Sequence, residues 1–302
     1  MGESRLERAE PAGATPFLKW AGGKSKSLGV IESHCPATIR TYYEPFLGGG
    51  AMFFRLASLG WIRRAVISDA NKDLMNCYVV IRDHIDELLD RLRELQKKAG
   101  DREFYYRSAR RRFNQIPLDT GLEGDIEKAS LLLYLNKTCY NGLYRVNRKG
   151  EFNVPWGRYR NPTILDESNL RAVHRMVKGK ETRILCCDYA TAVEDAAAGD
   201  FIYFDPPYQP ISTTANFTQY TVEGFTIKEQ ERLANAIAQL DSKGCYCMLS
   251  NSPKVRPLYE KHGYSIKAVN VLRSISCVGN KRGPVEELLV MNYTSYRARS
   301  VL

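Results

Sequence analysis

Short apolar runs alternate with helical stretches near both ends of the chain, and this alternation predicts an α/β fold. The strand-like runs fall at residues 42–45, 65–68, 183–187, 201–204, 245–249, 269–275 and 287–293. Helical stretches at 51–58 and 233–240 lie between them, the second preceded by the capping box Thr226-Ile227-Lys228-Glu229. Such alternation predicts a mainly parallel sheet whose ligand site lies beyond the carboxyl ends of its strands.

The middle of the chain has a different pattern, helical throughout and without a convincing strand. One helix face collects Ile85, Leu88, Leu89, Leu92 and Leu95, and residues 129–135 are apolar enough for a buried helix. Residues 137–160 are rich in Gly, Asn, Arg and aromatic residues, which predicts a loop or hairpin. We therefore predict a helical insertion at 74–161 within an α/β domain formed by 16–73 and 162–302, with 1–15 as a flexible tail.

Composition narrows the class of protein. The formal net charge of +10 over 302 residues suggests a polyanionic partner, although a merely basic enzyme would have the same balance. No cysteine or histidine spacing matches a metal site, so no metal is expected, and Cys186, Cys187, Cys245 and Cys247 are read as buried small residues in a reducing cytosol. The charged N-terminus and the lack of an apolar run of roughly 18 residues predict a cytoplasmic protein without membrane contact. Nothing indicates an obligatory protein partner.

Three predicted strands end in groups that could bind a ligand. The first runs into Gly48-Gly49-Gly50, which allows close approach of the backbone to a ligand, although a tight turn would use the same residues. The second and third end at Asp69 and Asp188, where an acid can grip a ribose diol or simply cap a helix. Together these groups suit a cationic, ribose-bearing ligand better than a polyphosphate, and no phosphate-binding GxxxxGK[ST] loop is present.

The sharpest chemical signal is Asp205-Pro206-Pro207-Tyr208, directly after the predicted strand 201–204. The exocyclic N6 of adenine is a poor nucleophile because its lone pair is delocalised into the ring. Hydrogen bonds from the amino group to the Asp205 carboxylate and the Pro206 carbonyl would favour the tetrahedral nitrogen of a methyl-transfer transition state. The prolines stiffen the loop, and Tyr208 offers a face on which a flipped base can stack. A proline-rich turn with a capping aspartate is the plainer alternative.

Residues 137–160 combine positive charge with aromatic side chains. The basic residues are Lys137, Arg145, Arg148, Lys149, Arg158 and Arg160, and the aromatic residues are Tyr140, Tyr144, Phe152, Trp156 and Tyr159. Such a segment suits DNA, because cations meet phosphates, arginine reads guanine edges and aromatic rings stack. Phe152 and Trp156 could instead form the small aromatic core of a solvated hairpin. Arg110-Arg111-Arg112 is expected on an exposed helix face, in contact with phosphate or only with water.

Several motifs in order resemble the Dam family of DNA adenine-N6 methyltransferases, a D12 class. They are Phe17-Leu18-Lys19-Trp20-Ala21-Gly22-Gly23-Lys24, Glu44-Pro45-Phe46, Asp205-Pro206-Pro207-Tyr208 and Ser212-Thr213-Thr214-Ala215-Asn216-Phe217-Thr218. The resemblance spans about residues 17–293 and implies a Rossmann-like S-adenosylmethionine-dependent methyltransferase sheet with a helical target-recognition insertion. By this resemblance S-adenosylmethionine binds at Trp20, Lys24, Phe46, Gly48, Gly50, Asp69, Asp188 and Asp205.

The resemblance also implies a DNA target. The stretches Tyr140–Arg145 and Glu151–Pro155 are similar to the recognition hairpin of family members that methylate GATC in double-stranded DNA. It implies DNA contacts from Lys19, Tyr140, Asn141, Leu143, Arg145, Asn153, Pro155, Arg158 and Tyr159, with Arg145 reading guanine. Tyr144 departs from the family pattern, which has a smaller residue there. Another adenine site, RNA, a protein amide and a silent DNA binder are the alternatives.

Overall fold

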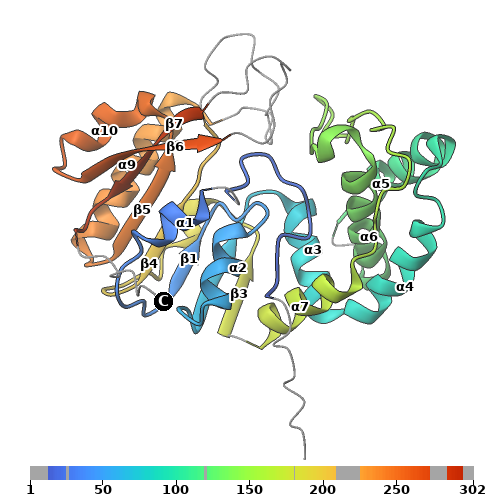
Figure 1. The fold of residues 1–302 in the computed structure, drawn as a ribbon, viewed down its shortest axis with the longest axis horizontal. Coiled ribbons are helices and arrows are strands. Elements are labelled where there is room, and N and C mark those ends of the chain that lie inside the picture. The colour runs from blue at the N-terminus through green and yellow to red at the C-terminus, as the bar shows by residue number, and fades with distance from the viewer. Residues whose placement is uncertain are drawn as a thin grey trace, which may run out of the picture.

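A computed structural model describes residues 13–24, 27–118, 121–179, 181–208, 225–272 and 284–294 (Figure 1). Its centre is a seven-stranded sheet in the order β3-β2-β1-β4-β5-β7-β6. The strands are β1 (Tyr42–Glu44), β2 (Arg64–Ser68), β3 (Glu181–Leu185), β4 (Phe201–Phe204), β5 (Tyr246–Asn251), β6 (Ser265–Leu272) and β7 (Pro284–Met291). Strand β7 runs antiparallel to β5 and β6 on either side of it, and the other paired strands are parallel, so the sheet has Rossmann-like order with an antiparallel strand inserted beside β5. The predicted fold class is confirmed.

Each face of the sheet is covered by a separate apolar core, because alternate residues of a strand point to opposite faces. In β4, Phe201 and Tyr203 belong to one core, and Ile202 and Phe204 belong to the other. The first core is covered by α1 (Leu28–Glu32), α2 (Ala51–Ser58), α3 (Lys72–Asp83) and α7 (Glu167–Lys178). The second is covered by α8 (Tyr189–Ala192), α9 (Ile227–Ser242) and α10 (Arg256–Glu260), which follows the short turn η4 (Pro253–Val255).

The helical part lies to one side of the sheet (Figure 1). It consists of α4 (Ile85–Gln96), the π-helix η1 (Phe104–Ala109), α5 (Arg110–Gln115), α6 (Leu122–Thr138) and the 3₁₀ turn η2 (Tyr140–Gly142). Its apolar residues, such as Leu88 and Leu132, belong to the same core as Ile67 of the sheet. The predicted insertion is therefore helical but shares one continuous core with the α/β part, which fixes the two relative to each other.

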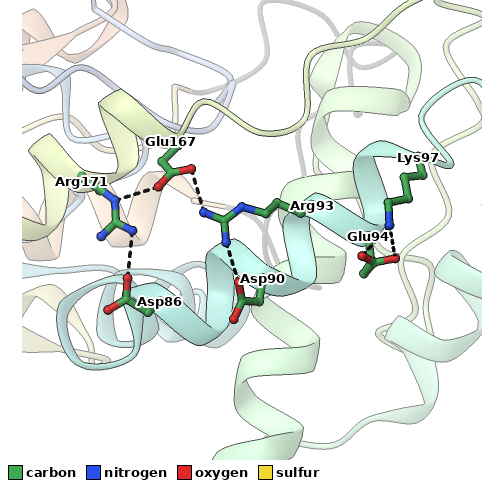
Figure 2. Close-up of polar contacts among 7 residues, drawn as sticks. All are labelled: Asp86, Asp90, Arg93, Glu94, Lys97, Glu167 and Arg171. Carbon is green, nitrogen blue, oxygen red and sulfur yellow. Dashed lines mark hydrogen bonds and ion pairs between the residues drawn. The ribbon is translucent and has the colours of Figure 1, made fainter.

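Charged side chains reinforce this junction on the surface. Arg171 of α7 lies 2.9 Å from Asp86 of α4, and Arg93 of α4 lies 2.9 Å from Glu167 of α7 (Figure 2). Arg171 also reaches Glu167, so the carboxylate of Glu167 joins both arginines. Exposed ion pairs of this kind contribute only ~0.2–1 kcal/mol each, so the shared core, and not these ion pairs, holds the two parts together.

Several predicted elements coincide with the structure and a few are corrected. The helix at 51–58, the strand at 201–204 and the Thr226 cap are confirmed, since Thr226 Oγ1 accepts from the Glu229 amide at 3.4 Å. The third strand covers Glu181–Leu185 rather than 183–187, and α6 extends to Thr138, into the predicted loop. Residues 273–275 of the strand predicted at 269–275 and the family motif at 212–218 lie outside the described residues.

Two further expectations were wrong. Residues 13–15 are fixed rather than flexible, because Ala14 is buried and Thr15 exchanges hydrogen bonds with Asn169. Cys186 is exposed and Cys187 is half-buried, because they follow β3, the edge strand of the sheet. Cys245 and Cys247 are buried as expected.

Across the described ranges, no helix is long and apolar enough to cross a bilayer. The same residues contain no cluster of His, Cys, Asp or Glu side chains that could hold a metal ion.

Candidate active site and DNA-reading surface

Asp205 follows the last residue of β4, at the carboxyl edge of the sheet, and belongs to a compact polar cluster. Lys24 Nζ lies 2.7 Å from Asp205 Oδ1 and donates to the Tyr208 hydroxyl at 2.9 Å. The Tyr208 hydroxyl in turn donates to Glu287 Oε2 at 2.9 Å, and Lys24 Nζ lies 3.8 Å from the same carboxylate. The structure therefore brings together three predicted residues and one acid, Glu287 of β7, that the sequence analysis missed.

Burial controls the charge of this cluster. It raises the pKa of Asp205 to about 6, against the opposing effect of the Lys24 ammonium, with a smaller upward contribution from Glu287. Burial also raises the pKa of Tyr208, so its hydroxyl stays protonated. Two acids share one lysine here, and a cationic ligand placed beside them would meet favourable charge.

A second buried acid, Glu44, ends β1. Its carboxylate accepts a hydrogen bond from the Tyr42 hydroxyl at 2.7 Å. Burial nevertheless raises the pKa of Glu44 to about 8, because the hydrogen bonds from Tyr42 and from the Phe53 backbone do not replace its hydration. Much of the Glu44 population is therefore neutral at pH 7, and Asp205 is the more readily ionised of these two acids.

The predicted glycine loop connects β1 to α2. Gly48 and Gly50 have φ values of +49° and +71°, which L side chains rarely adopt. A Cβ on Gly48 would lie 2.8 Å from Trp20 Cδ1, and one on Gly50 would lie 2.8 Å from the Tyr78 hydroxyl. Both positions therefore require glycine for conformation and for space.

Asp69 fixes this loop from the end of β2. Its Oδ2 accepts from the Gly48 amide at 3.1 Å, and its Oδ1 accepts from the Asn71 amide at 2.9 Å. Burial raises the pKa of Asp69, and these amide hydrogen bonds oppose the rise. The carboxylate does not cap α3, since that role belongs to the Asn71 side chain.

Aromatic side chains form the apolar side of the site. The Phe46 ring lies 5.2 Å from Tyr189 and 5.7 Å from Phe225, centroid to centroid, in the face of the sheet that α8 and α9 cover. Asp188 adjoins this group, but its carboxylate caps α8 through the Ala190 amide and pairs with Arg232 at 2.5 Å. Asp188 is therefore engaged by the α8 cap and by Arg232, which lies outside the other predicted donor residues.

These residues fit a sulfonium nucleoside. The buried acids of the Asp205 cluster suit a positive charge, Asp69 beside the glycine loop suits a ribose diol, and the Phe46 group offers an apolar wall for a base. A polyphosphate would meet carboxylates here, which excludes it on charge.

The predicted hairpin is present as a short irregular ribbon. Val146 bridges Phe152, the Asn147 amide donates to the Glu151 carbonyl at 2.9 Å, and the Tyr140 amide donates to the Pro155 carbonyl at 2.8 Å. Phe152 is buried and Trp156 is half-buried, so these two rings serve the aromatic core rather than a DNA surface.

Arg145 is held on this ribbon by a neutral partner. Its Nε donates to Asn153 Oδ1 at 2.7 Å and its Nη2 donates to the Asn153 carbonyl at 3.4 Å. No carboxylate among the described residues forms an ion pair with Arg145, so its charge is aligned but not neutralised.

Asn136, near the end of α6, joins the ribbon to the segment before Lys24. Its Oδ1 accepts from the Lys19 amide at 2.9 Å, and its Nδ2 donates to the carbonyls of Lys19 and Gly142 at 2.8 and 2.9 Å. Lys19 Nζ lies 5.3 Å from the Tyr159 ring centroid, and the Tyr159 hydroxyl accepts from the Asn141 amide at 3.1 Å. Lys19, Asn141 and Tyr159 are therefore neighbours, as a common DNA surface requires.

The remaining predicted DNA residues differ in exposure. Tyr140 is 52% exposed although it is large and apolar, Pro155 and Arg158 are exposed, and Leu143 is half-buried. Within the predicted arginine triplet, Arg112 pairs with Glu127, and Arg110 lies 4.7 Å from the Tyr106 ring centroid. Arg111 and Arg112 are exposed, as expected for this helix face, although Arg110 and Arg112 already contact other side chains of the protein.

Sequence comparison agrees with this geometry. Residues 20–275 match the family model for D12 class N6 adenine-specific DNA methyltransferases. The chain is 44% identical over 293 residues to the type II methyltransferase M.MjaIII of Methanocaldococcus jannaschii, covering 92% of this chain and 99% of the relative. It is 39% identical to the type II methyltransferase M1.LlaDCHI of Lactococcus lactis, covering 92% and 95%. It is 36% identical to the DNA adenine methylase of Escherichia coli K12, covering 91% and 94%.

The chain belongs to the D12 class of N6 adenine-specific DNA methyltransferases. Its substrate is DNA, its reaction is methyl transfer to adenine N6, and its methyl donor is S-adenosylmethionine. Membership sets aside RNA, a protein amide and a silent binder as the main function. The roles of individual residues and the target sequence of this methyltransferase are separate questions.

Proposed function

We propose that this methyltransferase acts on the adenine of duplex GATC after that base has left the helix stack. The observation that carries the chemistry is the buried Asp205–Lys24–Tyr208–Glu287 cluster at the end of β4. A base inside a duplex cannot reach a buried carboxylate, so the adenine has to be flipped out.

Asp205 would then hold the reacting nitrogen. Its carboxylate and the Pro206 carbonyl accept hydrogen bonds from the amino group, which favours the localised lone pair needed for attack. The Tyr208 ring, tethered through its hydroxyl to Glu287, stacks on the flipped base. Lys24 exchanges its ion pair with Asp205 for a contact to the incoming substrates.

S-adenosylmethionine supplies an electrophilic methyl group on a sulfonium. Its ribose would be held by Asp69, and its base would be enclosed by Phe46. The backbone of Gly48 and Gly50 would approach the ligand closely, while Trp20 and Lys24 close the site. Asp188 would contribute only if Arg232 released it. A DNA substrate also implies that the enzyme works in the cytoplasm, with the chromosome or with phage DNA.

The GATC target rests on the resemblance of the hairpin and on Arg145. An aligned, unneutralised guanidinium suits the O6 and N7 acceptors of guanine. Leu143 and Pro155 would meet a thymine methyl group, Tyr140 or Asn141 would fill the space of the flipped adenine, and Lys19 would touch the outer guanine. Asn153, Arg158 and Tyr159 would support these contacts along the DNA backbone.

The test is tritium transfer from labelled S-adenosylmethionine to two duplexes that differ only by GATC versus GTAC. Label on the adenine of the GATC duplex alone would support the proposal. Equal label on both would keep the adenine methyltransferase but reject this target, leaving another adenine site as the alternative. Asp205→Ala is the background control, because it should leave both duplexes unlabelled.

A further inference from the structure

Tyr144, where the chain departs from the family pattern, lies between the hairpin and the donor loop. Its ring stacks on Trp20, with centroids 5.3 Å apart and planes 28° apart. Trp20 in turn lies against Gly48, so closely that a Cβ there would be 2.8 Å from Trp20 Cδ1. The Trp20 ring therefore connects the glycine loop to Tyr144, which directly precedes Arg145 in the sequence.

A hydrogen bond connects Tyr144 to the same loop by a second route. Its hydroxyl donates to Asp73 Oδ2 at 2.7 Å, in the first turn of α3. The cap of α3, Asn71, is bonded through its amide to Asp69, and Asp69 holds Gly48. Both routes from Tyr144 thus end at Gly48, and both are built from packed or hydrogen-bonded groups.

The surroundings hold Tyr144 in place. Lys128 Nζ lies 3.4 Å from Asp73 Oδ1 and donates to the Ile116 carbonyl at 2.6 Å, so Asp73 is anchored from the far side. The Tyr144 ring also lies 5.9 Å from Phe152 of the hairpin core. A movement of Trp20 or of α3 would therefore be transmitted to the hairpin rather than absorbed by empty space.

We infer that Tyr144 is a positioning residue that couples occupancy of the donor site to the conformation of the DNA-reading hairpin. Donor binding and duplex binding should then strengthen each other by the same factor, since coupling between two sites is reciprocal. The inference rests on the proposed donor site at Trp20, Gly48 and Asp69 but not on the GATC target.

The direct test measures binding of S-adenosylhomocysteine, which cannot transfer a methyl group, with and without a saturating duplex that the enzyme methylates. We expect the duplex to tighten this binding by at least about fivefold, within the usual range of coupling factors. Tyr144→Leu keeps an apolar side chain but loses the aromatic stack and the hydroxyl, and should bring the factor to within roughly twofold of unity. Tyr144→Phe keeps the stack and should retain most of the factor.

Tyr134→Phe is the matched control, because it removes another buried tyrosine hydroxyl, bonded to the Lys98 carbonyl at 3.0 Å, away from Trp20. Its coupling factor should equal that of the wild type. If loss of coupling came only from a general loosening of the helical part, this control variant would lose coupling too. A wild-type factor of one, or an unchanged factor in Tyr144→Leu, would overturn the inference.

A second measurement needs neither DNA nor folding of the leucine variant. Hydrogen exchange of the hairpin amides of Asn147 and Asn153, which donate to Glu151 and Arg145, is compared with and without S-adenosylhomocysteine. The inference predicts at least threefold slower exchange in the wild-type enzyme when this ligand is bound, a modest gain in the local free energy of opening, about 0.7 kcal/mol. Unchanged exchange would contradict it even if GATC proved to be the target, and slower exchange would support it even if GATC did not.

Discussion

The catalytic cluster and the recognition hairpin use a cation in opposite ways. Lys24 is 5% exposed and ion-paired with Asp205, whereas Arg145 is half-buried and held by the neutral amide of Asn153. The buried pair sets the charge of the catalytic carboxylate before any substrate arrives. The neutral tether instead aligns a charge and leaves it available for DNA. Changes in the cluster should therefore alter the rate on every sequence, and changes in the hairpin should alter the choice among sequences.

The largest effect is expected at Asp205. Asp205→Ala removes the acceptor that stabilises the developing charge on N6, and should lower kcat at least about 10²–10³-fold, as for other preorganised groups at a reacting centre. DNA affinity should change little, because the carboxylate lies in the buried cluster. Single-turnover methyl transfer and DNA titration would be compared. Normal turnover by this variant would refute the proposed mechanism, and melting curves would exclude unfolding.

The pH dependence tests the same cluster. Transfer requires the ionised carboxylate, whose pKa in the free enzyme is raised by burial to about 6, so kcat/KM should fall as the pH drops below about 6. Lys24 lowers this pKa and Glu287 raises it. Lys24→Met should therefore move the acid limb to higher pH, and Glu287→Gln should move it to lower pH. Shifts in the same direction in both variants would contradict the assignment.

The hairpin should respond differently. Arg145→Ala should cost about 1–3 kcal/mol of discrimination, roughly fivefold to 150-fold, at one base pair. The kcat on GATC, measured at saturating duplex, should stay near the wild-type value. The measurement is kcat/KM on duplexes changed one base pair at a time. Arg158→Ala, at an exposed arginine of the same segment, is the comparison, since a phosphate contact should weaken all sequences alike. Uniform loss in Arg145→Ala would make Arg145 a phosphate contact instead.

Local signals in the sequence predicted some helices and strands better than others. The strand Phe201–Phe204 and the helix Ala51–Ser58 coincide with their predictions because an apolar run or a glycine turn marks their ends. The third strand was predicted at 183–187 but lies at Glu181–Leu185. It is the edge strand of the sheet, and its bounds are set by pairing with β2 rather than by its own apolar pattern. The π-helix at Phe104–Ala109 had no signal at all.

The contacts that complete the sites are long-range, and periodicity cannot show them. Glu287 is buried beside Lys24 because β7 is inserted between β5 and β6, although the acids Glu286 and Glu287 at the start of that apolar strand were a visible hint. Asn136 and Tyr144 find partners in the segment around Trp20, far away in the sequence. Residue types were therefore predictable from motifs, whereas the network that holds them was not.

The smallest predicted effect separates alignment from contact within the hairpin. Asn153→Ala removes the acceptor of Arg145 Nε and should cost about 0.5–1.5 kcal/mol, the usual net value of one hydrogen bond, at the base pair that Arg145 reads. If Asn153 acts through Arg145, the double variant should discriminate no worse than Arg145→Ala alone, because the two effects are not independent. Additive losses would mean that Asn153 contacts DNA by itself. Either way kcat on GATC should stay near the wild-type value, since neither side chain touches the buried Asp205 cluster.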